Sequence, residues 1–162
     1  MSEKLALTGG RKVREKPFSS WPIFGADEER ALLDVLRGGL WGRLEGDRVD
    51  AFEAAFAAYQ GARYAIGVTN GTVALRLALL AAGLEEGDEV IVPAHTFTAT
   101  AAAVTLAGAT PVFVDVDPVT LTIAPEKIEK AITPHTKAII PVHLYGLPAD
   151  MNMIMGIAEK HN

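Results

Sequence analysis

The stretch from Val90 to Val114 contains no Asp, Glu, Lys or Arg. An uncharged run of this length can cross a bilayer, but it also matches two β-strands and a crossover helix that are buried on both faces. Pro93, Gly108, Pro111 and five threonines interrupt the run, and such residues favour the globular alternative. We therefore expect a globular protein with a parallel sheet and no membrane-spanning segment.

Apolar runs alternate with helical patterns on both sides of this stretch. We expect strands at residues 64–69, 89–93, 111–115 and 138–144. We expect helices at residues 27–37, 49–59, 72–82, 98–107 and 125–131, and a last helix with Asp150 as its N-cap. Strands rich in Val and Ile that are joined by helices indicate an α/β fold, with a mostly parallel sheet and helices on both faces.

We expect the 162 residues to form an irregular arm, residues 1–26, and a domain, residues 27–162.

The composition limits the possible functions. The absence of cysteine excludes disulfides, thiolate metal sites and thiol catalysis. The net charge of −5 and the scattered Lys and Arg argue against nucleic-acid binding. No apolar signal-peptide core follows the first residues, so a cytoplasmic protein is expected.

The junction Thr69-Asn70-Gly71-Thr72 joins an expected strand to an expected helix. Unpaired backbone N–H groups and the positive end of the helix dipole make such a junction a binding place for phosphate. The alternative is an ordinary strand-to-helix turn with Thr72 as the cap. The spacing is neither a dinucleotide fingerprint nor a P-loop.

Other residues that could bind a ligand or act in catalysis follow directly after the expected strands. Open α/β sheets bind ligands at these carboxyl ends. The side chain of Phe97 either packs in the core or stacks under a flat ligand ring. His95 and His143 are either hydrogen-bonded structural residues or catalysts. Asp115 and Asp117 are expected to shape a turn, the alternative being a metal site formed with His143.

The order of motifs resembles the DegT/StrS-type family of pyridoxal-phosphate (PLP) enzymes, the sugar aminotransferases. The resemblance runs from about Pro22 to the last residue. The motifs are Phe52-Glu-x-x-Phe-Ala-x-Tyr-x-Gly61, Val68-Thr-Asn-Gly-Thr-x-Ala-Leu75, Gly87-Asp-Glu-Val-Ile-Val-Pro-Ala-His-Thr-Phe97, Gly108-Ala-x-Pro-Val-Phe-Val-Asp-Val-Asp117, Ala131-Ile-Thr-Pro-x-Thr-Lys-Ala-Ile-Ile-Pro-Val-His-Leu-Tyr-Gly146 and Pro148-Ala-Asp-Met151. The resemblance implies part of the large domain of a PLP-transferase fold.

The resemblance also implies roles for single residues. Gly71 and Thr72 would hold the PLP phosphate, and Phe97 matches the aromatic position that stacks on the pyridine ring. Trp41 and Arg43 match positions that line the substrate pocket. His143 matches a recurrent strand-end histidine on the substrate side, without an assigned role.

Family membership implies an aminotransferase that moves an amino group from glutamate or glutamine onto a keto-sugar or keto-cyclitol. It implies a homodimer at full length, and Trp21-Pro22 and Leu40-Trp41 favour the branch that makes amino-cyclitols and 3-amino-5-hydroxybenzoate. A few members of the family are dehydratases, which leaves that reaction open.

A PLP transaminase needs a lysine for the Schiff base and an acidic partner for the pyridinium nitrogen. In the family both follow the region matched here, and none of the seven lysines has the family's lysine context. We therefore expect the first half of an enzyme, without the small C-terminal domain and inactive alone. The alternatives are a non-catalytic PLP-fold binding or regulatory module, and one half of a split enzyme.

Overall fold

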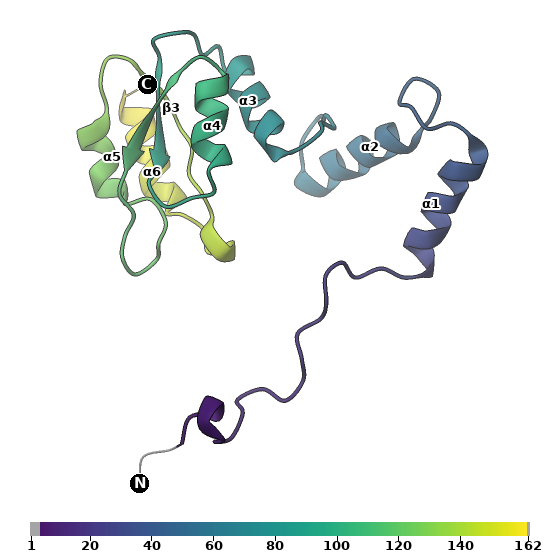
Figure 1. The fold of residues 1–162 in the computed structure, drawn as a ribbon. Helices are drawn as coiled ribbons and strands as arrows, with labels where there is room; N and C mark the ends of the chain where they lie inside the picture. Colours follow the sequence, from purple (N-terminus) through teal and green to yellow (C-terminus); the bar gives the residue numbers. More distant parts are fainter. Residues whose placement is uncertain (1–3, 162) are drawn as a thin grey trace. The chain divides into compact units, whose positions relative to one another are not determined.

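The computed structural model describes residues 4–161 (Figure 1). The chain divides into two compact units, one ending at Ala65 and the other beginning at Ile66. Each unit is described by itself. The boundary predicted between an arm and a domain after residue 26 stays a prediction.

The first unit consists of an arm and two helices. The arm contains one short 3-10 turn, η1 (Ala6–Thr8), and the helices are α1 (Ala26–Gly38) and α2 (Arg48–Gln60), as predicted. The Glu28 carboxylate accepts the Gly25 N–H at 2.7 Å, which caps the start of α1. This hydrogen bond lowers the pKa of Glu28. Gly39 adopts a left-handed conformation (φ 73°) that ends α1.

The first unit buries little apolar surface of its own. No residue of α1 is buried, and Ala57 is the buried residue of α2. Phe52 and Phe56 stack with ring centroids 5.6 Å apart, yet both stay about half exposed. Because buried apolar area is the main favourable term in folding, these two helices gain little stability from contacts within their own unit.

The second unit is built on a three-stranded parallel sheet. Its strands are β1 (Glu89–Pro93), β2 (Thr110–Val114) and β3 (Thr136–Ile139), in the order β2-β1-β3. Val90 pairs with Pro111 on one side and with Ala138 on the other. The parallel arrangement confirms the α/β class predicted from the sequence.

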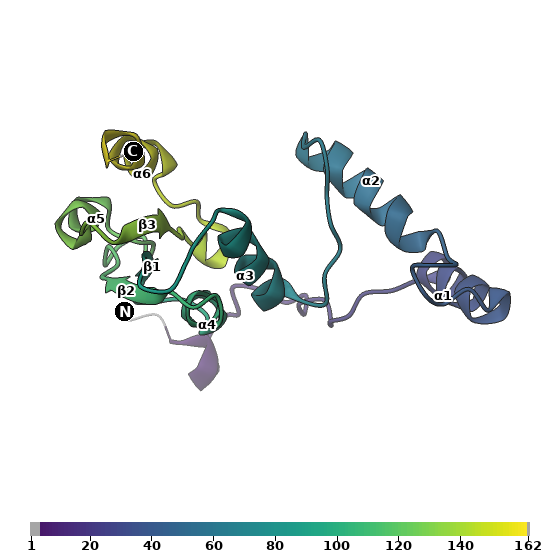
Figure 2. The ribbon, with the colours of Figure 1, turned by 90° about the horizontal axis from the view of Figure 1, so that it is seen from above.

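Helices cover both faces of this sheet (Figure 2). One layer contains α3 (Gly71–Ala81) and α4 (Ala99–Leu106), and the other contains α5 (Pro125–Ala131) and α6 (Met151–His161). Successive β1 side chains point to opposite faces. Val90 and Val92 therefore pack with Leu79 of α3, whereas Ile91 packs with Ile128 and Ile154. Among the described residues, no helix has the length and apolar composition needed to cross a membrane.

Two predicted strands differ from the structure. Residues 64–69 do not form a strand, and Tyr64 and Ile66 are each 77% exposed. A strand exists only through ladder hydrogen bonds, and no strand in residues 4–161 pairs with this segment. The strand predicted at residues 138–144 is β3 (Thr136–Ile139) in the structure, so it ends at Ile139. The Ile140 N–H still donates to the Ile91 carbonyl at 2.9 Å, but among the described residues no backbone hydrogen bond joins residues 141–144 to β1.

Candidate functional site

The amino-terminal ends of α3 and α4 lie at the carboxyl edge of the sheet. After α3 ends at Ala81, the chain enters β1 at Glu89, and after α4 ends at Leu106 it enters β2 at Thr110. Both helices therefore end at the amino edge and begin at the opposite one. The Arg76 Nε donates to the Leu106 carbonyl at 2.9 Å, which holds the two helices side by side.

Asn70 caps α3. It is extended (φ −168°), and its Oδ1 accepts the Val73 N–H at 3.0 Å while its carbonyl accepts the Ala74 N–H at 3.0 Å. The interpretation of Thr72 as the cap is therefore wrong. Within residues 4–161, the N–H groups of Gly71 and Thr72 and the Thr72 hydroxyl have no hydrogen-bond partner. These donors, at the positive end of the helix dipole, are suited to an anion.

Gly71 leaves open space over the first turn of α3. Its φ is not in the left-handed region, and a Cβ placed on it would meet no atom within 4 Å. Neither the backbone conformation nor packing against the described residues therefore requires glycine at this position. A phosphate group that approaches the free N–H donors would use the space that a side chain would otherwise fill.

Phe97 follows β1 at the same carboxyl edge. Its side chain is 77% exposed, so the alternative of core packing is wrong. The turn beneath it is fixed, because the Phe97 carbonyl accepts the Thr100 N–H at 3.0 Å and the hydroxyls of Thr96 and Thr100 are 2.9 Å apart. Sequence reasoning missed the buried Thr100. The sequence feature that could have pointed to it is the spacing of Thr96 and Thr100, because residues four apart lie about one helical turn from each other.

His143 fixes the turn that follows the third strand. Its Nδ1 accepts the N–H of Ala149, a buried residue, at 3.0 Å. This hydrogen bond assigns the ring proton of the neutral imidazole to Nε2. Tyr145 in the same turn has a φ of 51°, which is unusual for a residue with a side chain. His95 is exposed, and no hydrogen bond joins its ring to another of the described residues.

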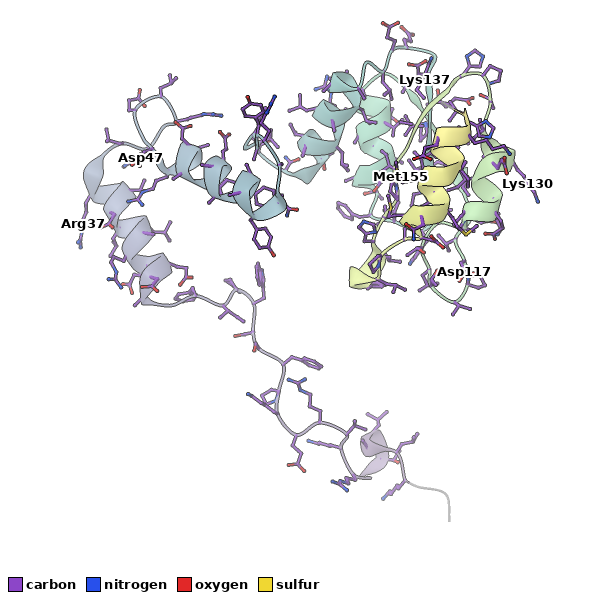
Figure 3. The ribbon with its side chains drawn as sticks, turned by 180° about the vertical axis from the view of Figure 1, so that it is seen from behind. Arg37, Asp47, Asp117, Lys130, Lys137 and Met155 are labelled. Atoms are coloured by element: carbon purple, nitrogen blue, oxygen red, sulfur yellow. The ribbon has the colours of Figure 1, made fainter. Side chains whose placement is uncertain are left out.

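Asp117 shapes a turn, as predicted (Figure 3). Its carboxylate accepts the N–H groups of Thr120 at 2.8 Å and Val119 at 2.9 Å, and these bonds lower its pKa. Asp115 forms an ion pair with Lys127 at 3.2 Å. In the part of the chain that the structure describes, no three His, Cys, Asp or Glu side chains come together as a metal site would require.

Trp41 and Arg43 belong to the first unit. The Trp41 Nε1 donates to the Leu36 carbonyl at 3.4 Å. The Arg43 guanidinium forms ion pairs with Glu53 at 2.8 Å and Asp50 at 3.4 Å. Trp41 thus ties the loop between the two helices to the end of α1, and Arg43 ties it to the first turns of α2. The predicted role of both residues in substrate binding stays a prediction.

The structure thus brings Gly71, Thr72 and Phe97 to one edge of the second unit. The sequence pattern of the DegT/DnrJ/EryC1/StrS aminotransferase family matches residues 22–162. The chain belongs to this family. It spans 35–39% of the length of three curated relatives, so its similarity to them concerns only part of each.

Three curated relatives are similar in sequence to this chain. L-glutamine:2-deoxy-scyllo-inosose aminotransferase from Streptomyces lividus is 41% identical over all of this chain and 39% of the relative. 3-Amino-5-hydroxybenzoate synthase from Amycolatopsis mediterranei is 47% identical over 91% of the chain and 38% of the relative. A pleiotropic regulatory protein from Geobacillus stearothermophilus is 52% identical over 82% of the chain and 35% of the relative. The branch predicted from the sequence is therefore among the relatives.

Solved structures have the same fold. The crystal structure of 3-amino-5-hydroxybenzoic acid synthase superposes with a TM-score of 0.86 at 46% identity, over 90% of this chain and 38% of that chain. A putative sugar aminotransferase from Streptococcus pneumoniae, solved in its PLP form, gives a TM-score of 0.83 at 36% identity, over 90% of this chain and 36% of that chain. Solved structures that resemble this chain thus include proteins bound to PLP, and this family likeness confirms the predicted fold class.

Proposed function

We propose that this chain is the cofactor-holding part of a PLP-dependent aminotransferase. The intact enzyme moves an amino group from glutamate or glutamine onto a keto-sugar or keto-cyclitol, and the donor leaves as the corresponding keto acid. The observation that carries the proposal is the open space at Gly71 beside free N–H donors, at the same sheet edge as the exposed ring of Phe97. The similarity to a glutamine-dependent cyclitol aminotransferase supports the choice of donor and acceptor.

The described residues fit PLP. The N–H groups of Gly71 and Thr72 and the Thr72 hydroxyl would donate to its phosphate, whose charge the positive end of α3 stabilises. The exposed ring of Phe97 would lie against the pyridine ring, where an offset stack of two aromatic planes is favourable. Trp41, Arg43 and His143 are proposed on the substrate side. His143 would use its Nε2–H there, because Nδ1 is engaged by Ala149.

PLP, when bound, supplies an electron sink for the bonds broken in amino-group transfer. The residues of this chain hold and orient it, and we place the lysine and the acidic partner of the pyridine nitrogen outside this chain. The chain alone is therefore expected to bind the cofactor without turnover. We further propose that the intact enzyme is a cytoplasmic homodimer.

A second function is favoured by one relative. The protein from Geobacillus stearothermophilus that is 52% identical is named a pleiotropic regulatory protein. A binding module without catalysis would use the same phosphate donors and the same aromatic plate. Whether turnover appears when the missing part of the enzyme is supplied separates this alternative from the aminotransferase.

The test of the proposed cofactor site is a Gly71→Ala substitution in the whole chain, with PLP affinity measured by calorimetric titration. The added methyl group meets no atom of the described residues within 4 Å, so folding stability is expected to be retained. It occupies the phosphate's space, so PLP affinity is expected to fall about tenfold or more through lost N–H donors. Inorganic phosphate is expected to compete with PLP, and pyridoxal without phosphate is expected to bind weakly.

Gly156→Ala is the matched control. Gly156 lies inside α6, also has an ordinary φ, and also has open space where a Cβ would be. Alanine there is expected to stabilise the chain by about 0.5–1 kcal/mol without changing PLP affinity. Equal PLP affinities for Gly71→Ala and Gly156→Ala would show that α3 begins with an ordinary turn and not a phosphate site.

A further inference from the structure

Asn70 and Gly71 are the only Asn-Gly pair in the sequence. An asparagine loses its side-chain amide when the backbone nitrogen of the next residue attacks its side-chain carbonyl carbon. Glycine favours this attack, because it has no Cβ that obstructs its own nitrogen. The start of α3 therefore contains a pair of residues that can react with each other in water without an enzyme.

The attacking nitrogen is accessible in the folded chain. Asn70 and Gly71 are both exposed, and the Gly71 N–H has no hydrogen-bond partner within residues 4–161. The open space at Gly71 lets water and hydroxide reach this N–H. The positive end of the α3 dipole stabilises the negative charge that develops on the nitrogen as its proton is removed.

Two hydrogen bonds of Asn70 restrain the reaction. Its Oδ1 accepts the Val73 N–H and its carbonyl accepts the Ala74 N–H, each at 3.0 Å. Asn70 is extended (ψ 171°), and closing a five-membered ring requires rotation about the bond between its Cα and its carbonyl carbon. This rotation breaks the bond from Ala74, so the first turn of α3 must open. Helix ends fray at low free-energy cost, so the opening is a local event.

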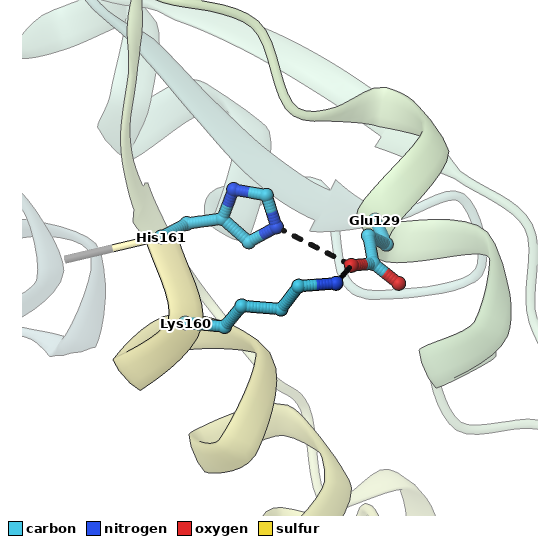
Figure 4. Close-up of polar contacts among 3 residues, drawn as sticks. All are labelled: Glu129, Lys160 and His161. Atoms are coloured by element: carbon cyan, nitrogen blue, oxygen red, sulfur yellow. Dashed lines mark hydrogen bonds and ion pairs between the residues drawn. The ribbon is translucent and has the colours of Figure 1, made fainter.

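Asn152 provides a matched comparison within the same chain. It is also exposed and also lies in the first turn of a helix, α6. The next residue is Met153, whose side chain obstructs its nitrogen and whose N–H is donated to the Asp150 carboxylate at 3.1 Å. The other end of α6 is held as well, because its last two described residues contact the Glu129 carboxylate of α5 (Figure 4). Asn152 is therefore expected to keep its amide.

We propose that Asn70 deamidates spontaneously in the cofactor-free chain, and that a phosphate group bound at the Gly71 N–H suppresses this reaction. The Gly71 nitrogen loses its proton to hydroxide and bonds to the Asn70 Cγ. The bond from Cγ to Nδ2 breaks, and Nδ2 takes a proton from water and leaves as ammonia. Water then opens the cyclic imide. Attack at Cγ gives aspartate, and attack at the backbone carbonyl carbon gives isoaspartate.

Both products change the start of α3. Aspartate places a negative charge beside the free donors of Gly71 and Thr72, and isoaspartate adds a carbon atom to the backbone before them. Each product weakens the binding of an anion at these donors. The protection by phosphate rests on the proposed function, whereas the deamidation of Asn70 does not.

The test incubates the whole cofactor-free chain at mildly alkaline pH in a buffer without phosphate. Isoelectric focusing follows the conversion of the neutral amide to a carboxylate, and peptide mapping locates it. An acidic form is expected to accumulate, with the change at residue 70 and Asn152 unaltered. Gly71→Ala is expected to slow the reaction about tenfold or more, because a Cβ then stands beside the attacking nitrogen.

Gly156→Ala is the control variant, because it also replaces a glycine that has open space around it. It is expected to deamidate at residue 70 like the unaltered chain. The proposal is overturned if residue 70 keeps its amide, if Asn152 reacts faster than Asn70, or if the two alanine variants react at the same rate.

PLP tests the protection. At a PLP concentration about ten times the dissociation constant from calorimetry, the rate is expected to fall about tenfold, because only the free chain reacts. Pyridoxal has the same aldehyde without the phosphate and is expected to leave the rate unchanged. PLP that binds in the calorimeter without slowing the reaction would overturn the protection. A chain that deamidates at residue 70 but does not bind PLP would contradict the proposed function and uphold the deamidation.

Discussion

The side-chain Oδ1 of Asn70 accepts the backbone N–H of Val73 at 3.0 Å, and this bond starts α3 without using the N–H groups of Gly71 and Thr72. The cap and the proposed phosphate donors are therefore separate groups. Asn70→Ala is expected to destabilise the chain by about 0.5–2 kcal/mol, because the Val73 N–H loses its acceptor. Denaturant unfolding measures this change.

Asn70→Asp separates capping from phosphate binding. Aspartate keeps an acceptor for Val73, so stability is expected to be retained. Its negative charge next to the phosphate donors is expected to weaken PLP binding. A variant that binds PLP as tightly as the unaltered chain would place the phosphate elsewhere.

Phe97→Leu should leave stability within about 0.5 kcal/mol, because the side chain is mostly exposed. PLP affinity is expected to fall, because leucine offers no aromatic plane for the pyridine ring. Phe97→Tyr keeps the plane and is the control that should retain binding. Spectroscopic titration with PLP compares the three proteins. If the leucine and tyrosine variants bind alike, the ring does not contact the cofactor.

His143→Ala removes the acceptor of the Ala149 N–H. Ala149 is 3% exposed, so its N–H would be left buried and unpaired, at an expected cost of about 1–3 kcal/mol. His143→Asn offers an oxygen close to the position of Nδ1 and should restore much of the loss. Thermal unfolding of both variants tests this. Equal destabilisation would show that the imidazole contributes mainly by packing.

The Asp117 carboxylate is expected to make the folding stability of the chain depend on pH in acid. The N–H groups of Thr120 and Val119 lower its pKa in the folded chain below the ordinary value of about 3.9. Its contribution is therefore complete above that ordinary value and is lost as the pH falls through the folded pKa. Unfolding temperatures measured as the pH is lowered from neutral through and below the ordinary Asp pKa of about 3.9 should fall less steeply for Asp117→Asn.

Thr120→Val is the control for this pH dependence. It removes the Thr120 hydroxyl contact at 3.2 Å but keeps both backbone donors to Asp117. Its acid slope is expected to stay close to that of the unaltered chain. If Asp117→Asn has the unaltered slope instead, the turn carboxylate does not govern acid stability.

Glu129 holds the last turn of α6 through Lys160 and His161, and the Lys160 contact is the main cause of its lowered pKa. Glu129→Gln should speed hydrogen exchange in that turn at low salt, and added salt should reduce the difference, because exposed ion pairs are screened. Glu126, on the same helix, forms no ion pair with another residue in 4–161, so Glu126→Gln should leave exchange unchanged. Identical exchange in both variants would contradict the role of Glu129.

Most of the second unit could be predicted from local patterns. Pro125 at the start of α5 and Asp150 before α6 act where the sequence places them, and the Asp150 carboxylate accepts the Met153 N–H at 3.1 Å. Caps and helix spacing depend on residues within one turn of each other, so they can be read without knowing the tertiary contacts. The same holds for the turn at Asp117.

The sequence by itself determined the α/β class, the helices and the family, and it predicted the junction at Gly71 that we propose for phosphate. Tertiary structure alone decided that residues 64–69 are not a strand, that Phe97 is exposed, and that β3 lies at an edge of the sheet formed by the described residues. The physical reason is that ladder hydrogen bonds and burial depend on residues far apart in the chain. Apolar runs such as residues 64–68 and 90–93 look alike in sequence, and only the second has strand partners.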